Sequence, residues 1–305
     1  MHISVLLNEA IEGLNIKDGG IYVDCTLGYA GHSKEILKRN KKGWLYAFDQ
    51  DSDAIECSSK ILSSIGSNYE IIKSNFVNLK QELEKRNIKK VDGILFDLGV
   101  SSPQLDNAER GFSYQHDARL DMRMDKSNPI SAYEVVNNYK ESELITIFYK
   151  YGEERYSKSI ARHIVEYRKN KPIETTLELV DIIKSSVPEK YKRETHPAKR
   201  CFQAIRIEVN KELEVFESAL KDAIDMLNID GRLCVITFHS LEDKICKDIF
   251  KKNSEINKVF RGLPNIPYEY LPKLEIIKKI TPSATELDNN NRSRSATLRI
   301  ARKIK

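Results

Sequence analysis

The first hundred residues alternate between short apolar runs and amphipathic stretches, and this alternation restricts the fold more than any other feature of the sequence. Apolar runs lie at 21–27, 44–48, 69–73 and 91–96, and stretches with helical spacing follow the first three at 33–39, 54–62 and 77–86. Strands and helices that alternate over short connections are typical of βαβ units. The chain is therefore expected to be an α/β protein built on a parallel sheet.

The strand pattern stops near Asp106 and returns only after Asn210. In between, helical spacing predicts five helices, at 131–138, 141–151, 156–169, 176–185 and 198–210, and Thr175 with Glu178 resembles a capping signal before the fourth. A helix near 211–227 and strands near 232–238 and 295–301 then continue the first pattern. We therefore predict one domain from residues 1–105 and 211–305, interrupted by an all-helical domain at 106–210.

The net charge of +5 conceals an uneven distribution. Residues 155–211 carry 14 Lys and Arg against 7 Asp and Glu, residues 251–305 carry 13 against 5, and the rest of the chain has a net charge of −10. Two basic regions on an acidic body indicate a polyanionic partner such as RNA, although solvated outer faces of basic helices would give the same counts. Within the segment 251–294, the polar and basic stretch 289–295 is interpreted as RNA-facing, and a disordered surface loop is the alternative.

Several classes of protein are excluded by what the sequence lacks. The longest apolar runs cover a few residues, whereas a membrane-spanning helix needs about 20, and the N-terminus shows no basic segment followed by an apolar one. The five cysteines are scattered without a Cys-x-x-Cys pair, so neither a disulfide framework nor a cysteine zinc site is expected. We expect a cytoplasmic protein with no bound metal and no membrane partner.

The turn after the first strand is the first sign of a ligand site. Gly28 and Gly31 allow a tight turn and a close approach of the backbone to a ligand, and the free N–H groups of the next helix lie beside it. Asp49 ends the second strand, where an acidic residue accepts hydrogen bonds from ribose in nucleotide-binding folds. Because the full G-x-G-x-x-G pattern is absent, a dinucleotide is disfavoured. An ordinary strand-to-helix turn would also use these glycines.

A second candidate site follows the fourth strand, which ends at Asp97. The segment 98–106 contains Gly99, two serines, Pro103 and Gln104. Ligands of open α/β sheets bind at the carboxyl ends of the strands, so these polar groups are candidates for an active site. A loop that only links two domains is the alternative. His32 could contact a carboxylate or cap its helix, and Asp24, in the first strand, is expected to hold a loop or a ligand amine because a buried charge needs a partner.

Longer motifs extend over essentially the whole chain and carry a family resemblance. They are His2 with VLLNE (5–9), DCTLGYAGHS (24–33), DLGVSSPQLD (97–106), ERGFS (109–113), LDMRMD (120–125), YGEE (151–154), HPA (196–198), FQAIRI (202–207), VN with EL (209–213), FHSLED (238–243) and NRSRSA with LR (291–299). In these motifs the chain closely resembles the bacterial small-subunit rRNA cytosine-N4-methyltransferase family. One position departs from the pattern, because Ala30 stands where the family usually has a second consecutive glycine.

The resemblance implies a class I (Rossmann-like) S-adenosylmethionine-dependent methyltransferase sheet with an inserted all-helical domain. It implies S-adenosyl-L-methionine as cofactor, and the matching positions are Ala30, Gly31, His32, Asp49, Phe76, Asp97 and Gln104. Phe76 would stack on the adenine, and core packing is its alternative role. The implied substrate is the N4 amine of a decoding-centre cytidine, position 1402, in 16S rRNA of the small ribosomal subunit. A homodimer is left open.

The chemistry of an exocyclic amine suggests what the catalytic residues must do. The N4 lone pair is delocalised into the ring, so the enzyme must orient the amine and accept its hydrogen bonds. We assign this work to Asp97, Ser102 and Gln104. His239 could contact the cytidine, or Ser240 and Asp243 could cap its helix. The rival functions are a non-catalytic RNA-binding ribosome assembly factor and, less compatible with the turn, an NAD-dependent dehydrogenase.

Overall fold

The computed structural model describes residues 4–256, 258–260, 262 and 264–305, so His2 of the family motifs lies outside the described residues. The chain forms two compact units. The sheet unit combines Met1–Gly99 with Leu213–Lys305, and the helical unit is Val100–Glu212. The predicted domain division at 105/106 and 210/211 stays a prediction.

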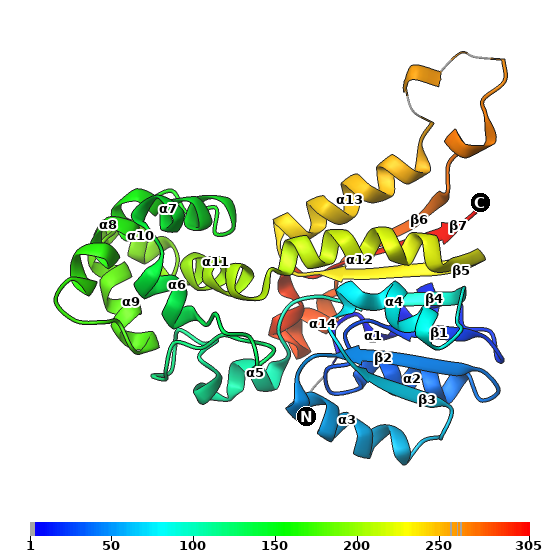
Figure 1. The fold of residues 1–305 in the computed structure, drawn as a ribbon, viewed down its shortest axis with the longest axis horizontal. Coiled ribbons are helices and arrows are strands. Elements are labelled where there is room, and N and C mark those ends of the chain that lie inside the picture. The colour runs from blue at the N-terminus through cyan, green and yellow to red at the C-terminus, as the bar shows by residue number, and fades with distance from the viewer. Residues whose placement is uncertain (1–3, 257, 261, 263) are drawn as a thin grey trace. The chain divides into compact units, whose positions relative to one another are not determined.

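The sheet unit contains seven strands in the order β3-β2-β1-β4-β5-β7-β6 (Figure 1). The strands are β1 Ile21–Asp24, β2 Trp44–Asp49, β3 Tyr69–Lys73, β4 Val91–Asp97, β5 Leu227–Thr237, β6 Leu274–Ile280 and β7 Thr297–Lys303. The first five pair in parallel, and β7 pairs antiparallel with both β5 and β6. The predicted α/β fold with a class I methyltransferase sheet is therefore confirmed.

Helices cover both faces of this sheet, which explains why its central strands are apolar on both sides. Alternate residues of β4 enter different cores: Ile94 and Phe96 pack under α4 (Leu79–Lys85), α12 (Glu212–Met226) and α13 (Ser240–Ser254), whereas Leu95 packs under α1 (Leu7–Leu14), α2 (Gly31–Arg39) and α3 (Ser52–Ser63). The two-residue period of a strand thus sends neighbouring side chains into cores on opposite faces of the sheet.

The helical unit has a core of its own. Its helices are α5 Ser102–Asp106, α6 Ala132–Asn138, α7 Glu141–Lys150, α8 Ser157–Arg168, α9 Thr176–Ser185, α10 Glu189–Glu194 and α11 Ala198–Asn210, and their apolar faces enclose one cluster of buried side chains. The predicted capping signal is confirmed, because Thr175 and Glu178 exchange hydrogen bonds at the start of α9.

Several elements were not predicted from the sequence. They include α1, α5, the short helix α10, α14 (Ala284–Asn289) and strand β6, whose residues are mostly exposed at the edge of the sheet. Short helices at Phe76–Asn78, Ala108–Arg110, Lys258–Phe260, Tyr268–Tyr270 and Asn291–Ser295 complete the described elements. In the described residues, every helix is too short or too polar to cross a membrane.

Candidate functional site

Three parallel strands of the sheet unit end in an aspartate at the same edge. β1 ends at Asp24, β2 at Asp49 and β4 at Asp97, and β1 lies between the other two (Figure 1). The carboxyl ends of parallel strands are where ligands of open α/β sheets bind. We refer to these aspartates, with the turn 28–32 that follows β1, as the carboxyl edge.

Asp49 connects the second strand to that turn. One carboxylate oxygen accepts a hydrogen bond from the backbone N–H of Gly28 at 2.9 Å, and the other accepts one from Asp51 at 2.9 Å. Burial raises the pKa of the Asp49 carboxyl to about 6, and the backbone donors oppose that rise. A carboxylate with two donors already in place retains lone pairs for a hydroxyl group.

The turn has a left-handed backbone at two of its residues. Gly28 has a φ of 48°, and Ala30, the N-cap of α2, has a φ of 58°. A non-glycine residue in this conformation costs about 1 kcal/mol or more, so Ala30 carries a cost that glycine avoids. At Gly31, a Cβ would lie 1.7 Å from Oγ of Ser4. The need for glycine at 31 is therefore explained by packing inside the protein.

Asp97 is the least satisfied carboxyl of the carboxyl edge. Its Oδ2 lies 3.5 Å from Nδ1 of the buried His32, and its buried Oδ1 has no hydrogen-bond partner within the described part of the chain. Burial, and then the nearby carboxyls of Asp24 and Glu242, raise the pKa of Asp97 well above its usual value. An unsatisfied buried acceptor of this kind is a place for a donor or a cation from a ligand.

Asp24 is occupied by its own loop. Its carboxylate accepts hydrogen bonds from Oγ of Ser33 at 2.7 Å and from the backbone N–H of Thr26 at 3.0 Å. Burial raises the pKa of Asp24 as well. Of the two roles expected for Asp24, the structure gives it the first, because it fixes the turn before α2.

Glu242, which the sequence analysis did not single out, adds a further carboxyl from the start of α13. Its side chain accepts hydrogen bonds from the backbone N–H groups of Phe238 at 2.8 Å and His239 at 3.3 Å. His239 is the N-cap of α13, and its Nδ1 accepts from the Glu242 N–H. Capping thus comes from His239 and Glu242, whereas Asp243 pairs with both guanidinium ends of Arg299. The FHSLED motif contained the signal for this capping box.

Phe76 begins the short helix after β3. Its ring meets that of Phe96 edge to face, with 5.5 Å between centroids, and it is only partly buried against the core. The side chain therefore packs on one side and stays accessible on the other. Both roles considered for Phe76, core packing and stacking on a ligand ring, are compatible with this position.

Gln104 and Ser102 belong to the helical unit, in α5. Ser101 is the N-cap, and the Gln104 side chain accepts a hydrogen bond from the Ser101 N–H at 3.0 Å, which closes a capping box. The side chain of Ser102 lies outside the described part of the structure. The predicted grouping of these residues with Asp97 stays a prediction.

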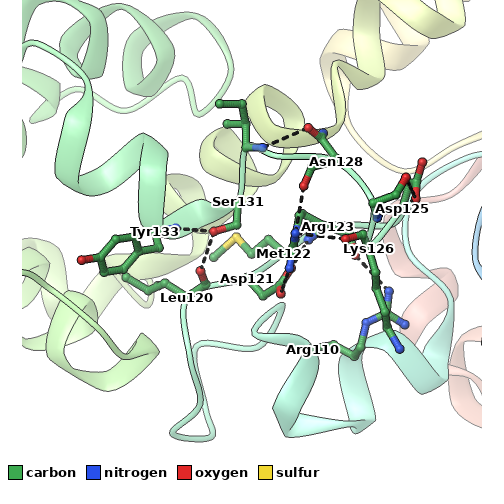
Figure 2. A network of polar contacts seen from close by, with 12 residues as sticks. Arg110, Leu120, Asp121, Met122, Arg123, Asp125, Lys126, Asn128, Ser131 and Tyr133 are labelled. Atoms are coloured by element: carbon green, nitrogen blue, oxygen red, sulfur yellow. Dashed lines mark hydrogen bonds and ion pairs between the residues drawn. The ribbon is translucent and has the colours of Figure 1, made fainter.

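Polar contacts fix the LDMRMD motif of the helical unit (Figure 2). The Arg123 guanidinium donates to both carboxylate oxygens of Asp121 at 2.8 Å and to the carbonyl oxygens of Lys126 and Asn128 at 3.0 and 2.8 Å. Arg110 donates to the Arg123 carbonyl at 2.9 Å. The motif is thus explained by loop structure.

The YGEE motif also has a structural role. Glu154 is fully buried and accepts hydrogen bonds from the Tyr191 hydroxyl at 2.6 Å and the Tyr156 N–H at 2.8 Å. A Cβ at Gly152 would lie 2.7 Å from the Arg200 carbonyl oxygen. These contacts fasten α8, α10 and α11 to one another.

The outer surface of those three helices carries unpaired positive charge. Arg155 and Lys192 form ion pairs with Glu194 and Glu189. Five further exposed cations make no ion pair with the residues that the structure describes, namely Lys158, Arg162, Lys190, Arg193 and Lys199. We call these five residues the basic surface. Their charge is available to a polyanion.

The RNA-facing role of 289–295 stays a prediction, and the described residues of 251–294 contain regular secondary structure. These residues include strand β6, paired with β7, and a stacked pair of rings, Phe260 and Tyr270, with centroids 4.3 Å apart. Tyr268 and Tyr270 are exposed. Exposed aromatic rings among lysines can stack on unpaired bases.

Comparisons with known proteins agree over the whole chain. The model of the MraW methylase family matches residues 1–304. A relative from Exiguobacterium sibiricum, named "Ribosomal RNA small subunit methyltransferase H", is 58% identical over 307 residues, which is 100% of this chain and 98% of that protein. Among solved structures, an rRNA methylase from Streptococcus thermophilus covers 100% of both chains at 13% identity and a TM-score of 0.46.

Proposed function

Because the chain belongs to the MraW methylase family, we propose that it methylates ribosomal RNA of the small subunit with S-adenosyl-L-methionine as methyl donor. The target in this proposal is the N4 amine of cytidine 1402 in 16S rRNA. Support for the coarser statement comes from the 58% identical relative, whose name specifies a small-subunit rRNA methyltransferase. The finer statement rests on the family motifs of the sequence.

The carboxyl edge fits a cationic nucleoside. When bound, S-adenosyl-L-methionine supplies an activated methyl group on a positively charged sulfur, together with an amino group that donates hydrogen bonds. Burial, and then the carboxyls of Asp24 and Glu242, raise the pKa of Asp97, and Oδ1 of Asp97 lacks a donor among the described residues. A cation beside these carboxyls would favour their ionised forms.

The proposed cofactor contacts divide among the strand ends. Asp49 accepts hydrogen bonds from the ribose hydroxyls, because it is already oriented by the Gly28 and Asp51 N–H groups. Phe76 stacks on the adenine with the side that does not face Phe96. Ala30, Gly31 and His32 form the start of α2, whose N–H groups line the turn. Gln104 is proposed as a further contact.

The proposed chemistry needs an acceptor for the amine hydrogens. Ionised Asp97 accepts a hydrogen bond from the target amine and turns its lone pair toward the methyl group. His32, 3.5 Å from Asp97, holds the carboxyl in place. Ser102 and Gln104 are proposed to bind the same amine or its ring. Alignment and proton acceptance then supply the rate enhancement.

The basic surface is proposed to hold the RNA. Its five unpaired cations would neutralise backbone phosphates, which makes the interaction dependent on salt. The substrate in this proposal is the folded RNA within the small ribosomal subunit, in the cytoplasm. A homodimer is left open.

The observation that carries the proposal is Oδ1 of Asp97, a buried carboxylate acceptor without a donor among the described residues, at the strand end of a methylase-family sheet. The test is transfer of a labelled methyl group from S-adenosyl-L-methionine to small ribosomal subunits, followed by base analysis. Label on the N4 of a cytidine is the expected result. Binding of the subunit without transfer would favour the assembly factor instead, and label elsewhere would contradict the assigned target.

A further inference from the structure

A lysine-lined cavity lies at the opposite edge of the sheet from the carboxyl edge. It has a volume of about 590 Å³ and lies where β4 and β5 begin and β7 ends. Its lining residues all come from the sheet unit, and the charged ones are Lys80, Glu84, Lys89, Lys90, Asp225, Lys303 and Lys305. β4 runs from Val91, near the cavity, to Asp97 at the carboxyl edge. Because a strand rises about 3.3 Å per residue, roughly 20 Å separates the cavity from the carboxyl edge.

Lys303 is the buried member of this set. Its side chain is only 5% exposed, and its Nζ donates one hydrogen bond, to the Ile224 carbonyl oxygen at 2.8 Å. It forms no ion pair with any carboxylate among the described residues. Burial, and then the charges of Lys273, Lys90 and Lys305, lower the pKa of Lys303 to about 8, whereas Asp225 opposes them. A buried ammonium with three donors and one acceptor is incompletely satisfied.

The charges around Lys303 leave the cavity positive. Asp225 is paired with Lys273 at 3.0 Å, and Lys90 donates to the Asp225 carbonyl oxygen at 2.5 Å. Lys305 lies over the Tyr268 ring. Lys80 and Lys89 are exposed and make no ion pair in the described structure, and Glu84 is exposed as well. Five lysines against two carboxylates, one of them already paired, favour an anion.

We propose that this cavity is a phosphate-binding site in which Lys303 is the buried contact and Lys80, Lys89 and Lys90 are the outer contacts. Phosphate oxygens would supply the acceptors that the Lys303 ammonium lacks. The proposal does not depend on methyl transfer, because all of its residues lie at the other edge of the sheet. The phosphate can come from the backbone of an RNA or from a free anion, which share this chemistry.

The first test is calorimetry of the full-length protein with inorganic pyrophosphate and, separately, with small ribosomal subunits. Lys303→Met keeps the length of the side chain and removes the buried charge, a change that proteins often tolerate. Removing a charge-assisted hydrogen bond is expected to weaken binding of at least one probe by about tenfold. The matched control is Lys221→Met, since Lys221 is exposed, lies on α12 and pairs with Glu217 outside the cavity.

A second variant tests the proposal in case Lys303→Met fails to fold. Lys80→Glu with Lys89→Glu changes only exposed residues and is expected to weaken the same probe by tenfold or more. Loss of pyrophosphate affinity identifies a free anion, and loss of subunit affinity alone identifies the RNA backbone. Unchanged affinity for both probes in both variants would overturn the proposal. S-adenosyl-L-methionine binding is expected to stay normal in every variant, which separates this outcome from failure of the proposed function.

Discussion

The two edges of one sheet hold buried charges of opposite sign. At the carboxyl edge, burial raises the pKa values of Asp24, Asp49 and Asp97. At the other edge, burial lowers the pKa of Lys303. In both places burial is the main reason that the charged form is disfavoured. The comparison teaches that a buried, poorly paired charge indicates the sign of the missing partner: a cation at one edge and an anion at the other.

The largest effect is expected for methyl transfer when Asp97 of the carboxyl edge is changed. Asp97→Asn keeps the shape of the side chain and removes its negative charge, so methyl transfer should fall by about 100-fold or more, the usual contribution of a positioned acid–base group. Folding should be little affected, because burial already disfavours the charged form of this carboxyl in the unliganded protein. Single-turnover transfer and a thermal melt measure the two effects. Near-normal turnover with a normal melt would remove Asp97 from the chemistry.

A large fall in the melting temperature of Asp97→Asn would have another meaning. It would indicate that Asp97 mainly holds the loop after β4 in place. His32→Gln is the companion variant, because it removes the imidazole that lies 3.5 Å from Asp97. If His32 positions the carboxyl, its removal should lower the rate of transfer more than it lowers cofactor affinity.

The second prediction uses the titration of Asp49. Asp49→Ala should weaken S-adenosyl-L-methionine binding by about 1.5–3 kcal/mol, the value of hydrogen bonds to a charged acceptor. In the parent protein the carboxyl has a pKa of about 6. Affinity should therefore fall as the pH drops below about 6, by up to about tenfold per pH unit. Calorimetry at several pH values checks both statements, and Asp49→Asn should abolish the pH dependence.

Asp49 should also affect how the stability of the unliganded protein depends on pH. Its folded pKa lies above its ordinary value of about 4, so between about pH 4 and pH 6 the folded state binds a proton that the unfolded state does not. The contribution of Asp49 to stability should therefore increase as the pH falls through this window. Urea unfolding of the parent and Asp49→Asn at pH values inside and above the window measures it. An identical pH dependence in both proteins would contradict the assignment.

The third prediction contrasts exposed cations with the buried Lys303. Arg193→Glu with Lys199→Glu reverses two charges of the basic surface, so affinity for small ribosomal subunits should fall at low salt. The slope of log affinity against log salt should become shallower by about 0.7–0.9 for each phosphate that the variant no longer neutralises. Filter binding over a range of salt concentrations checks this. Lys171→Glu is a control on the same unit, because Lys171 pairs with Glu178. Normal binding of small ribosomal subunits by the double variant at every salt concentration would exclude the basic surface as the RNA-binding surface.

The smallest expected effect concerns Ala30. Ala30→Gly relieves a left-handed alanine, worth about 1 kcal/mol, but glycine costs about 0.5–1 kcal/mol of backbone entropy. Stability should change by less than about 1 kcal/mol, and cofactor affinity should stay within a few-fold. Chemical denaturation and calorimetry measure the two. A large gain in affinity would mean that the methyl group at position 30 obstructs the cofactor.

The sequence was sufficient for the parts of the fold with a strong local period. β1 to β4 and the five longer helices of the inserted unit, α6 to α9 and α11, were predicted within a few residues, because each has a clear apolar face. β6 was missed since, as an exposed edge strand between prolines, it shows no two-residue alternation. β5 begins at Leu227, whereas the sequence predicted this strand only from about residue 232. Pairing with β4 extends the strand beyond that local prediction.

Predicting the sites from the sequence had a different limit. Asp49 and Asp97 could be recognised because a strand end is a local feature. Glu242 could not, since its proximity to Asp97 depends on how β4 and β5 pair. The cavity around Lys303 was also inaccessible to sequence analysis, because its lysines come from separate segments of the chain. Such sites exist only once the register of the sheet is known.

The insertion between β4 and β5 has a consequence for the order of folding. β4 is complete at Asp97, but its neighbour β5 begins only at Leu227, so β4 keeps an open edge until the intervening chain has been made. Closing an unstructured loop of that length costs about 4 kcal/mol of entropy beyond a constant. Within the helical unit, Asn210 accepts from the Met124 N–H and donates to the Met122 carbonyl oxygen, each at 2.8 Å. Prior folding of the insertion would place Met122 and Met124 beside Asn210, replace the chain between them with a folded body, shorten the unstructured loop and let the nascent sheet finish before β4 aggregates.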